Sequence, residues 1–118
     1  MIATAYFTES GRIGAVHYGP DFDTLYRQLD TDQDLVAGEF DGNTYYVLNG
    51  EPTERPKQAT TLTGLWLTNL PIPSTLYIDG TAYLVDQFTV DLEFPLPGTY
   101  HLRVEAFPYL DWTAEVTV

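Results

Sequence analysis

The feature of this sequence that most constrains its fold is a strict alternation of apolar and polar side chains. It runs through three segments near the C-terminus, residues 88–94, 100–106 and 112–118. Successive side chains of a β-strand point to opposite faces, so each segment is predicted to be a strand with one buried and one solvated face. Short strands of this kind, joined by turns, predict an antiparallel β-sandwich. The core residues expected on the apolar faces are Phe88, Tyr100 and Leu102.

The turn before the second alternating segment carries the most specific local signal. Pro97-Gly98-Thr99 leads directly into Tyr100, whose ring is placed to be buried while its hydroxyl group reaches the backbone. This arrangement resembles the tyrosine corner of immunoglobulin-like sandwiches, although the chain has no cysteine and so lacks the disulfide of antibody domains. The resemblance implies an immunoglobulin-like antiparallel β-sandwich over residues 58–118, with a structural role for Tyr100.

Turn chemistry predicts the remaining strands of this domain. Residues 75–85 contain Asp79-Gly80, a dipeptide typical of two-residue hairpins, which would pair Leu76 with Tyr83. Residues 61–70 are predicted to form one strand, which ends at a proline-rich turn.

Residues 1–57 are predicted to form a smaller β-rich lobe with a single short helix. Two strands, residues 2–8 and 12–18, would form a hairpin through Ser10-Gly11. Apolar side chains at i, i+3, i+4 and i+7 then predict a helix at residues 22–29. The chain as a whole is therefore expected to be mainly all-β.

The end of this lobe is predicted to contain a second hairpin and a connector. Residues 35–40 and 44–48 would pair with one another, and Asn49-Gly50 would end the second strand. Residues 51–59 contain two prolines and are expected to link the two lobes.

The charge balance excludes several classes of partner. The chain has 17 acidic and 5 basic residues, a formal net charge of −12. Such a surface repels the phosphates of nucleic acids and of anionic membranes, so neither is an expected partner. No secretory signal or membrane-spanning run is recognisable, and we expect synthesis in a cytoplasm without an export address.

No catalytic, cofactor or metal site is predicted. Residues 30–34 begin like a calcium loop, but the required glycine and final glutamate are replaced by Leu35 and Asp41. His17 and His101 lie on predicted strands without a nucleophile motif nearby. The expectation is a non-enzymatic protein that needs no cofactor.

An aromatic loop between the last two strands is the candidate interaction site. Its residues Phe107, Tyr109 and Trp112 have two interpretations. They would either cap the end of the sandwich or contact another protein or a sugar.

Several turn motifs together resemble small proteins from tail gene clusters of tailed bacteriophages and prophages. The main one is residues 38–56, with the core Tyr46-Val-Leu-Asn-Gly-Glu51 followed by Arg55-Pro56. Further motifs lie at residues 10–12, 70–73, 78–80, 97–100 and 106–111.

The resemblance implies a structural component of the virion in the tail, baseplate or fibre-attachment region. The implied partners are other virion proteins or copies of the chain. Independently of the resemblance, the final strand, residues 112–118, is expected to lie at a sheet edge and to be completed by a neighbouring subunit. Three alternatives stay open: a tail-fibre assembly chaperone, a carbohydrate-binding module and a hydrolytic enzyme, the last of which the residue inventory argues against.

Overall fold

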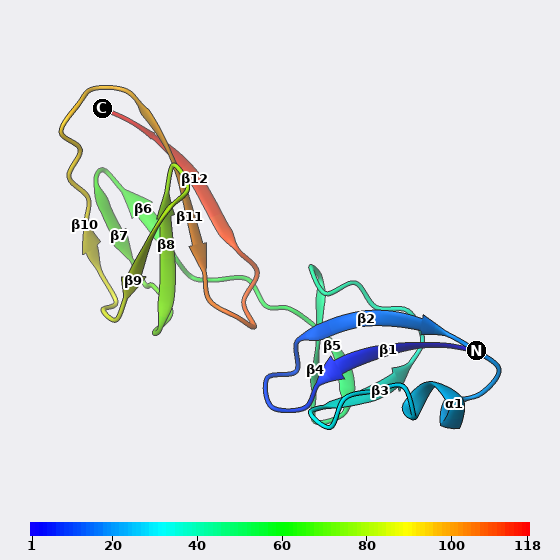
Figure 1. Ribbon diagram of the computed structural model, residues 1–118. Coiled ribbons are helices and arrows are strands. Elements are labelled where there is room, and N and C mark those ends of the chain that lie inside the picture. Colours follow the sequence, from blue (N-terminus) through cyan, green and yellow to red (C-terminus); the bar gives the residue numbers. More distant parts are fainter. The chain divides into compact units, whose positions relative to one another are not determined.

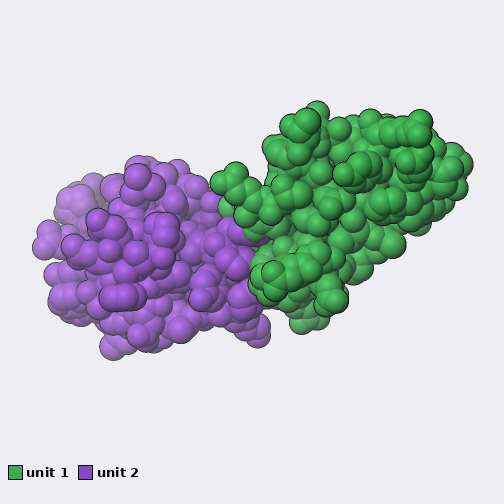
Figure 2. Space-filling view, turned by 90° about the horizontal axis from the view of Figure 1, so that it is seen from below, with its two compact units in different colours: residues 1–55 green, residues 56–118 purple.

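The computed structural model describes residues 1–118, and its regular secondary structure is almost entirely β (Figure 1). It contains twelve strands and one short helix, which confirms the mainly all-β prediction. The chain divides into two compact units, Met1–Arg55 and Pro56–Val118 (Figure 2). This division lies two residues before the boundary expected from the sequence. We call these parts unit 1 and unit 2.

Unit 1 is built around a central strand that is covered on both faces. Strand β1 (Ile2–Phe7) pairs antiparallel with β2 (Ile13–Tyr18) on one side and β3 (Gln33–Ala37) on the other. One face of β1 packs against Leu25 and Leu35, and the other packs through Tyr6 against Val36 and Val47. Burial on both faces explains why its side chains do not alternate between apolar and polar.

The helix is shorter than the spacing of apolar residues predicted. Helix α1 (Phe22–Tyr26) begins at Asp21, whose carboxylate accepts a hydrogen bond of 2.8 Å from the Thr24 amide. Residues 28 and 29 instead donate to carbonyls three residues earlier, which is the tighter pattern of a helix that ends. One turn suffices here because Leu25 alone reaches the core completely.

The predicted second hairpin is wrong in its pairing. Strand β3 pairs with β1, whereas β4 (Tyr45–Leu48) pairs with β5 (Glu51–Glu54). Asn49 and Gly50 form the turn between β4 and β5, with φ angles of 53° and 78°. The Asn-Gly dipeptide ends β4 as predicted, and because a two-residue turn of this kind matches the twist of a hairpin, it also joins β4 to β5. Four residues of the predicted connector, those of β5, therefore form a strand.

Unit 2 consists of two antiparallel sheets that share one core. The first has the order β10-β7-β6, formed by β6 (Thr61–Thr63), β7 (Trp66–Thr68) and β10 (Val90–Asp91). The second has the order β12-β11-β8-β9, formed by β8 (Ser74–Ile78), β9 (Thr81–Val85), β11 (Thr99–Glu105) and β12 (Trp112–Thr117). The shared core contains Leu67, Leu70, Leu76, Val85, Leu92, Leu102, Val104 and Val116.

Two strand predictions in unit 2 are wrong. Residues 61–70 form the hairpin of β6 and β7, which turns at Gly64 with a φ of 59°. Within residues 88–94 only the two residues of β10 pair, and they pair with β7. Phe88 is 68% exposed instead of buried, since it lies before β10 in a segment that bends, where its carbonyl accepts a hydrogen bond from the Leu70 amide. Alternation alone did not show where pairing begins.

The other predicted core residues lie where the alternation placed them. Leu102 is buried in the shared core. Tyr100 is partly buried and stacks on Phe94, with 4.2 Å between ring centroids. Its hydroxyl group donates a hydrogen bond of 2.8 Å to the carbonyl of Leu96. Asp79 and Gly80 join β8 to β9, and Leu76 pairs with Tyr83 as predicted.

Candidate interaction surface

The loop between β11 and β12 does not present its three aromatic residues as one exposed patch. Trp112 is partly buried and packs against the core, and Phe107 is also partly buried. Tyr109 is the exposed member, at 37%. A hydrogen bond from the Tyr109 amide to the Ala106 carbonyl closes the turn. The loop thus caps one end of the sandwich, and Tyr109 is its most exposed aromatic side chain.

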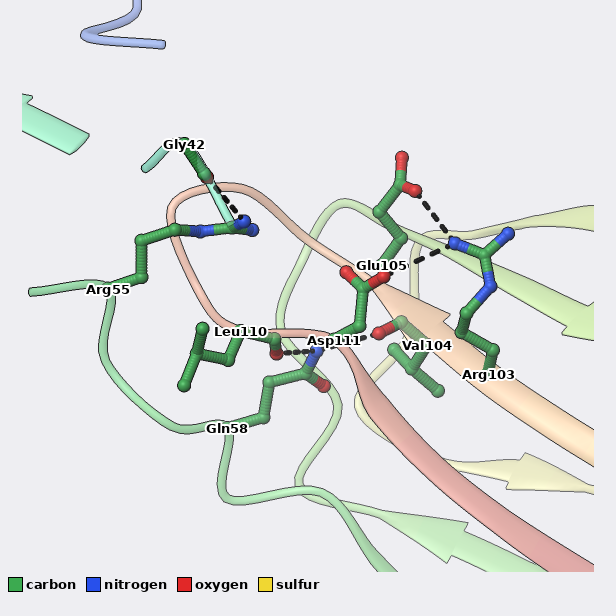
Figure 3. A network of polar contacts seen from close by, with 8 residues as sticks. All are labelled: Gly42, Arg55, Gln58, Arg103, Val104, Glu105, Leu110 and Asp111. Carbon is green, nitrogen blue, oxygen red and sulfur yellow. Dashed lines mark hydrogen bonds and ion pairs between the residues drawn. The ribbon is translucent and has the colours of Figure 1, made fainter. Parts of the chain in front are cut away.

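This loop is held in place by residues at the start of unit 2. The side-chain amide of Gln58 donates to the carbonyls of Val104 and Leu110, at 2.8 and 2.9 Å (Figure 3). Its oxygen accepts a hydrogen bond of 2.7 Å from the Thr60 hydroxyl group. The Leu110 amide donates to the Pro56 carbonyl at 2.7 Å. Gln58 therefore satisfies three polar groups at once and fixes the loop in one conformation.

No local pattern indicated this role for Gln58, which lies in the predicted connector. The same short stretch begins with Arg55, whose guanidinium donates to the Gly42 carbonyl within unit 1 (Figure 3). A side chain that bonds to the backbone 46 and 52 residues away leaves no local pattern. Only the folded chain shows such contacts.

An ion-pair cluster orders the outer face of the four-stranded sheet next to this loop. The Arg103 guanidinium lies 3.0 Å from Glu105 and 3.3 Å from Asp111 (Figure 3). It also lies 3.9 Å from the centre of the Tyr77 ring, a cation–π distance. Burial lowers the pKa of Arg103, but hydrogen bonds and the charges of Asp111 and Glu105 outweigh that effect and raise it. Arg103 therefore interacts with two carboxylates and one aromatic ring.

The same face holds a shallow hollow of about 460 Å³ without a catalytic arrangement. His101 is one of its lining residues, and its Nδ1 atom lies 3.2 Å from a carboxylate oxygen of Glu115. Both side chains are about two-thirds exposed, so the pair is a solvated cross-strand contact. His17 lies on β2 in the other unit.

No group of three or more histidine, aspartate or glutamate residues is arranged to hold a metal ion. In the segment that begins like a calcium loop, the Asp34 side chain accepts a hydrogen bond from the Leu35 amide. Asp34 also contributes, after burial, to raising the pKa of Tyr6. The contact of Asp34 with Tyr6, its partner on the neighbouring strand, joins β3 to β1, whereas the bond to Leu35 lies within β3.

A second hollow, which the sequence did not indicate, is lined by residues of β8, β9 and β10 and of the segments next to β9 and β10. This β9–β10 groove has a volume of about 440 Å³. Its lining includes core residues of both sheets, two exposed side chains of β9 and several carboxylates. The residues are Leu76, Ile78, Tyr83, Leu84, Val85, Asp86, Gln87, Val90, Asp91, Leu92 and Glu93. The one sequence signal was the lack of any charge in β9.

Comparisons with known proteins identify no family, relative or similar structure for this chain. The structure contains no helix that is both long enough and apolar enough to cross a membrane.

We expect Gln58→Glu to destabilise unit 2 by about 1–3 kcal/mol at neutral pH, because the variant lacks the amide donors of two carbonyls. The new carboxylate would face two carbonyl oxygens, which raises the pKa of the introduced group in the folded state. Its folded pKa would then exceed its unfolded pKa, so the deficit relative to wild type should shrink as the pH falls.

Chemical denaturation of both proteins from neutral to acidic pH measures this deficit. The matched control is Gln28→Glu, an exposed glutamine in unit 1, which should change stability little at any pH. A Gln58→Glu variant as stable as wild type at neutral pH would contradict the role of the side-chain amide.

Proposed function

We propose that this chain is a non-enzymatic structural and binding component of a bacteriophage virion, in the tail, baseplate or fibre-attachment region. The observation that carries the binding role is the free edge of β12, the outermost strand of the four-stranded sheet. A free edge presents backbone groups that another chain can pair with. The assignment to a virion rests on the resemblance of residues 38–56 and the other turn motifs to phage tail proteins.

The register of β12 identifies the groups available for pairing. Gly98 and Val118 exchange two backbone hydrogen bonds. In an antiparallel pair such bonded positions alternate with positions whose N–H and C=O groups point the other way. Thr113, Glu115 and Thr117 therefore direct their backbone groups away from β11. The adjacent loop, held by Gln58, is already ordered for contact, which lowers the entropy cost of binding.

We further infer that unit 2 is an immunoglobulin-like sandwich. The sheet orders β10-β7-β6 and β12-β11-β8-β9 support this topology, in which strands distant in sequence pair within each sheet. The hydrogen bond from the Tyr100 hydroxyl group to the carbonyl of Leu96, four residues upstream, has the form of a tyrosine corner.

Mass spectrometry of purified particles tests the virion assignment. A phage that encodes this chain should carry it in CsCl-purified particles, and crosslinking should join Tyr109 or β12 to a second virion chain. The interface is expected to exceed about 1,000 Å². Presence in infected cells together with absence from particles would overturn the assignment in favour of a fibre-assembly chaperone.

A further inference from the structure

We propose that the β9–β10 groove binds an extended segment of a partner protein that has alternating apolar side chains and flanking lysine or arginine residues. The segment would pair with the free edge of β9 and insert its apolar side chains between the two sheets. This inference names a second contact of the proposed binding component and the chemistry of its partner.

The groove exists because one side of the sandwich is not closed. Strand β10 is only two residues long, so it covers little of the core between β7 and the edge of the other sheet. The core residues Leu76, Val85 and Leu92 are consequently lining residues of the groove. These floor residues are themselves buried, and the exposed apolar surface above them is supplied by Tyr83, which is 50% exposed. This surface favours an apolar ligand, because binding removes it from water.

Strand β9 has none of the features that usually protect an edge. It contains neither a charged residue nor a proline, and four of its five residues are exposed. Leu84 is 92% exposed and Tyr83 is 50% exposed. Natural edge strands are normally blocked by charge, proline or a covering segment. An unprotected apolar edge is therefore best explained by a partner that covers it.

The turn before β9 determines which backbone groups are available. Ile78 and Thr81 flank the two-residue turn and form a hydrogen-bonded pair in a hairpin of this type. Hydrogen-bonded and non-hydrogen-bonded pairs alternate along an antiparallel ladder, so the N–H and C=O groups of Ala82 and Leu84 point away from β8. These groups are the ones that an added strand would engage.

The charge around the groove selects the partner. Asp86, Asp91 and Glu93 are among the lining residues, and no basic residue is. Unit 2 has only two basic residues, Arg103 and Lys57. Arg103 forms ion pairs with Glu105 and Asp111, and Lys57 lines a separate hollow. Three uncompensated carboxylates complement a basic segment. A second copy of this chain, with a net charge of −12, would instead place like charges together.

Binding of two designed peptides to the full chain tests the proposal. The probes are fluorescent peptides of sequence Lys-Val-Thr-Val-Thr-Val-Lys and Glu-Val-Thr-Val-Thr-Val-Glu, measured by fluorescence anisotropy at low salt. The basic peptide should bind at least about tenfold more tightly, and the difference should shrink in about 0.5 M salt as the charges are screened. Amide NMR shifts should be largest at Ala82 and Leu84.

Matched variants separate the groove from general electrostatics. Leu84→Lys and Glu93→Lys should each weaken binding of the basic peptide by about tenfold or more. Glu9→Lys makes the same charge change as Glu93→Lys, but at an exposed turn of unit 1, and should leave the affinity within about twofold of wild type.

Three results would overturn the proposal. The first is equal affinity for both peptides, and the second is no binding of the basic peptide at about 1 mM. The third is dimerisation of the free chain that Leu84→Lys abolishes, since this would assign the groove to a second copy. A negative peptide experiment would contradict only the groove proposal and not the virion assignment. Absence from particles would contradict only the virion assignment and not the groove proposal.

Discussion

Gly11→Ala is expected to destabilise unit 1 by about 3–5 kcal/mol, because the new methyl group has no space and the backbone is left-handed. Gly11 has a φ of 79°, and a Cβ atom there would lie 2.2 Å from the carbonyl oxygen of Val47. The atom that the new methyl group meets belongs to the backbone, so no side-chain rotation relieves the clash. The Gly11 carbonyl also accepts a hydrogen bond of 2.9 Å from the Val47 amide, which joins the β1–β2 turn to β4.

Gly50→Ala is the matched control for this prediction. Gly50 has almost the same φ, 78°, but nothing lies within 4 Å of the position of its added Cβ atom. We expect a loss of only about 1 kcal/mol, from the left-handed backbone alone. Chemical denaturation followed by tyrosine fluorescence measures both variants. Equal losses would show that the clash at Gly11 is relieved by movement of β4.

Leu67→Ala is expected to destabilise unit 2 by about 3–5 kcal/mol, because it leaves a cavity in a fully buried site. Leu67 lies on β7, is completely inaccessible to solvent and belongs to the core shared by both sheets. Its neighbours belong to paired strands and cannot collapse freely into the space.

Leu84→Ala makes the same chemical change on the exposed side of β9. Because Leu84 is 92% exposed, its truncation removes little packing and should change stability by less than about 0.5 kcal/mol. Thermal denaturation of the two variants gives the comparison. Similar melting temperatures would mean that the two sheets of unit 2 do not share a tightly packed core.

Local sequence signals predicted the parts of the fold that depend on neighbouring residues. The Asp79-Gly80 turn requires two consecutive left-handed residues, and their φ angles of 47° and 86° set the β8–β9 register. The alternation in β11 and β12 likewise specified which side chains face the core, as Leu102 shows. In each case the determining residues lie within one strand or one turn.

The predictions failed where a strand had to choose a distant partner. Strand β3 pairs with β1, about thirty residues earlier, although β4 follows it more closely in the chain. Nothing local distinguishes these choices, since either partner satisfies the backbone hydrogen bonds. Phe88 shows the same limit, because the alternation did not indicate that pairing begins only at Val90, after this residue.

For the interaction surfaces, too, some features could be predicted from the sequence and others depend on the folded chain. The sequence showed an aromatic loop, and the folded chain decided that Trp112 packs inward while Tyr109 stays exposed. The Gln58 contacts and the β9–β10 groove depend on segments far apart in sequence. The amino-acid pattern determined strand periodicity, turn chemistry and net charge, because these are properties of adjacent residues or of composition. Tertiary structure alone decided which edges are free and which side chains meet, because long-range packing selects among locally equivalent pairings.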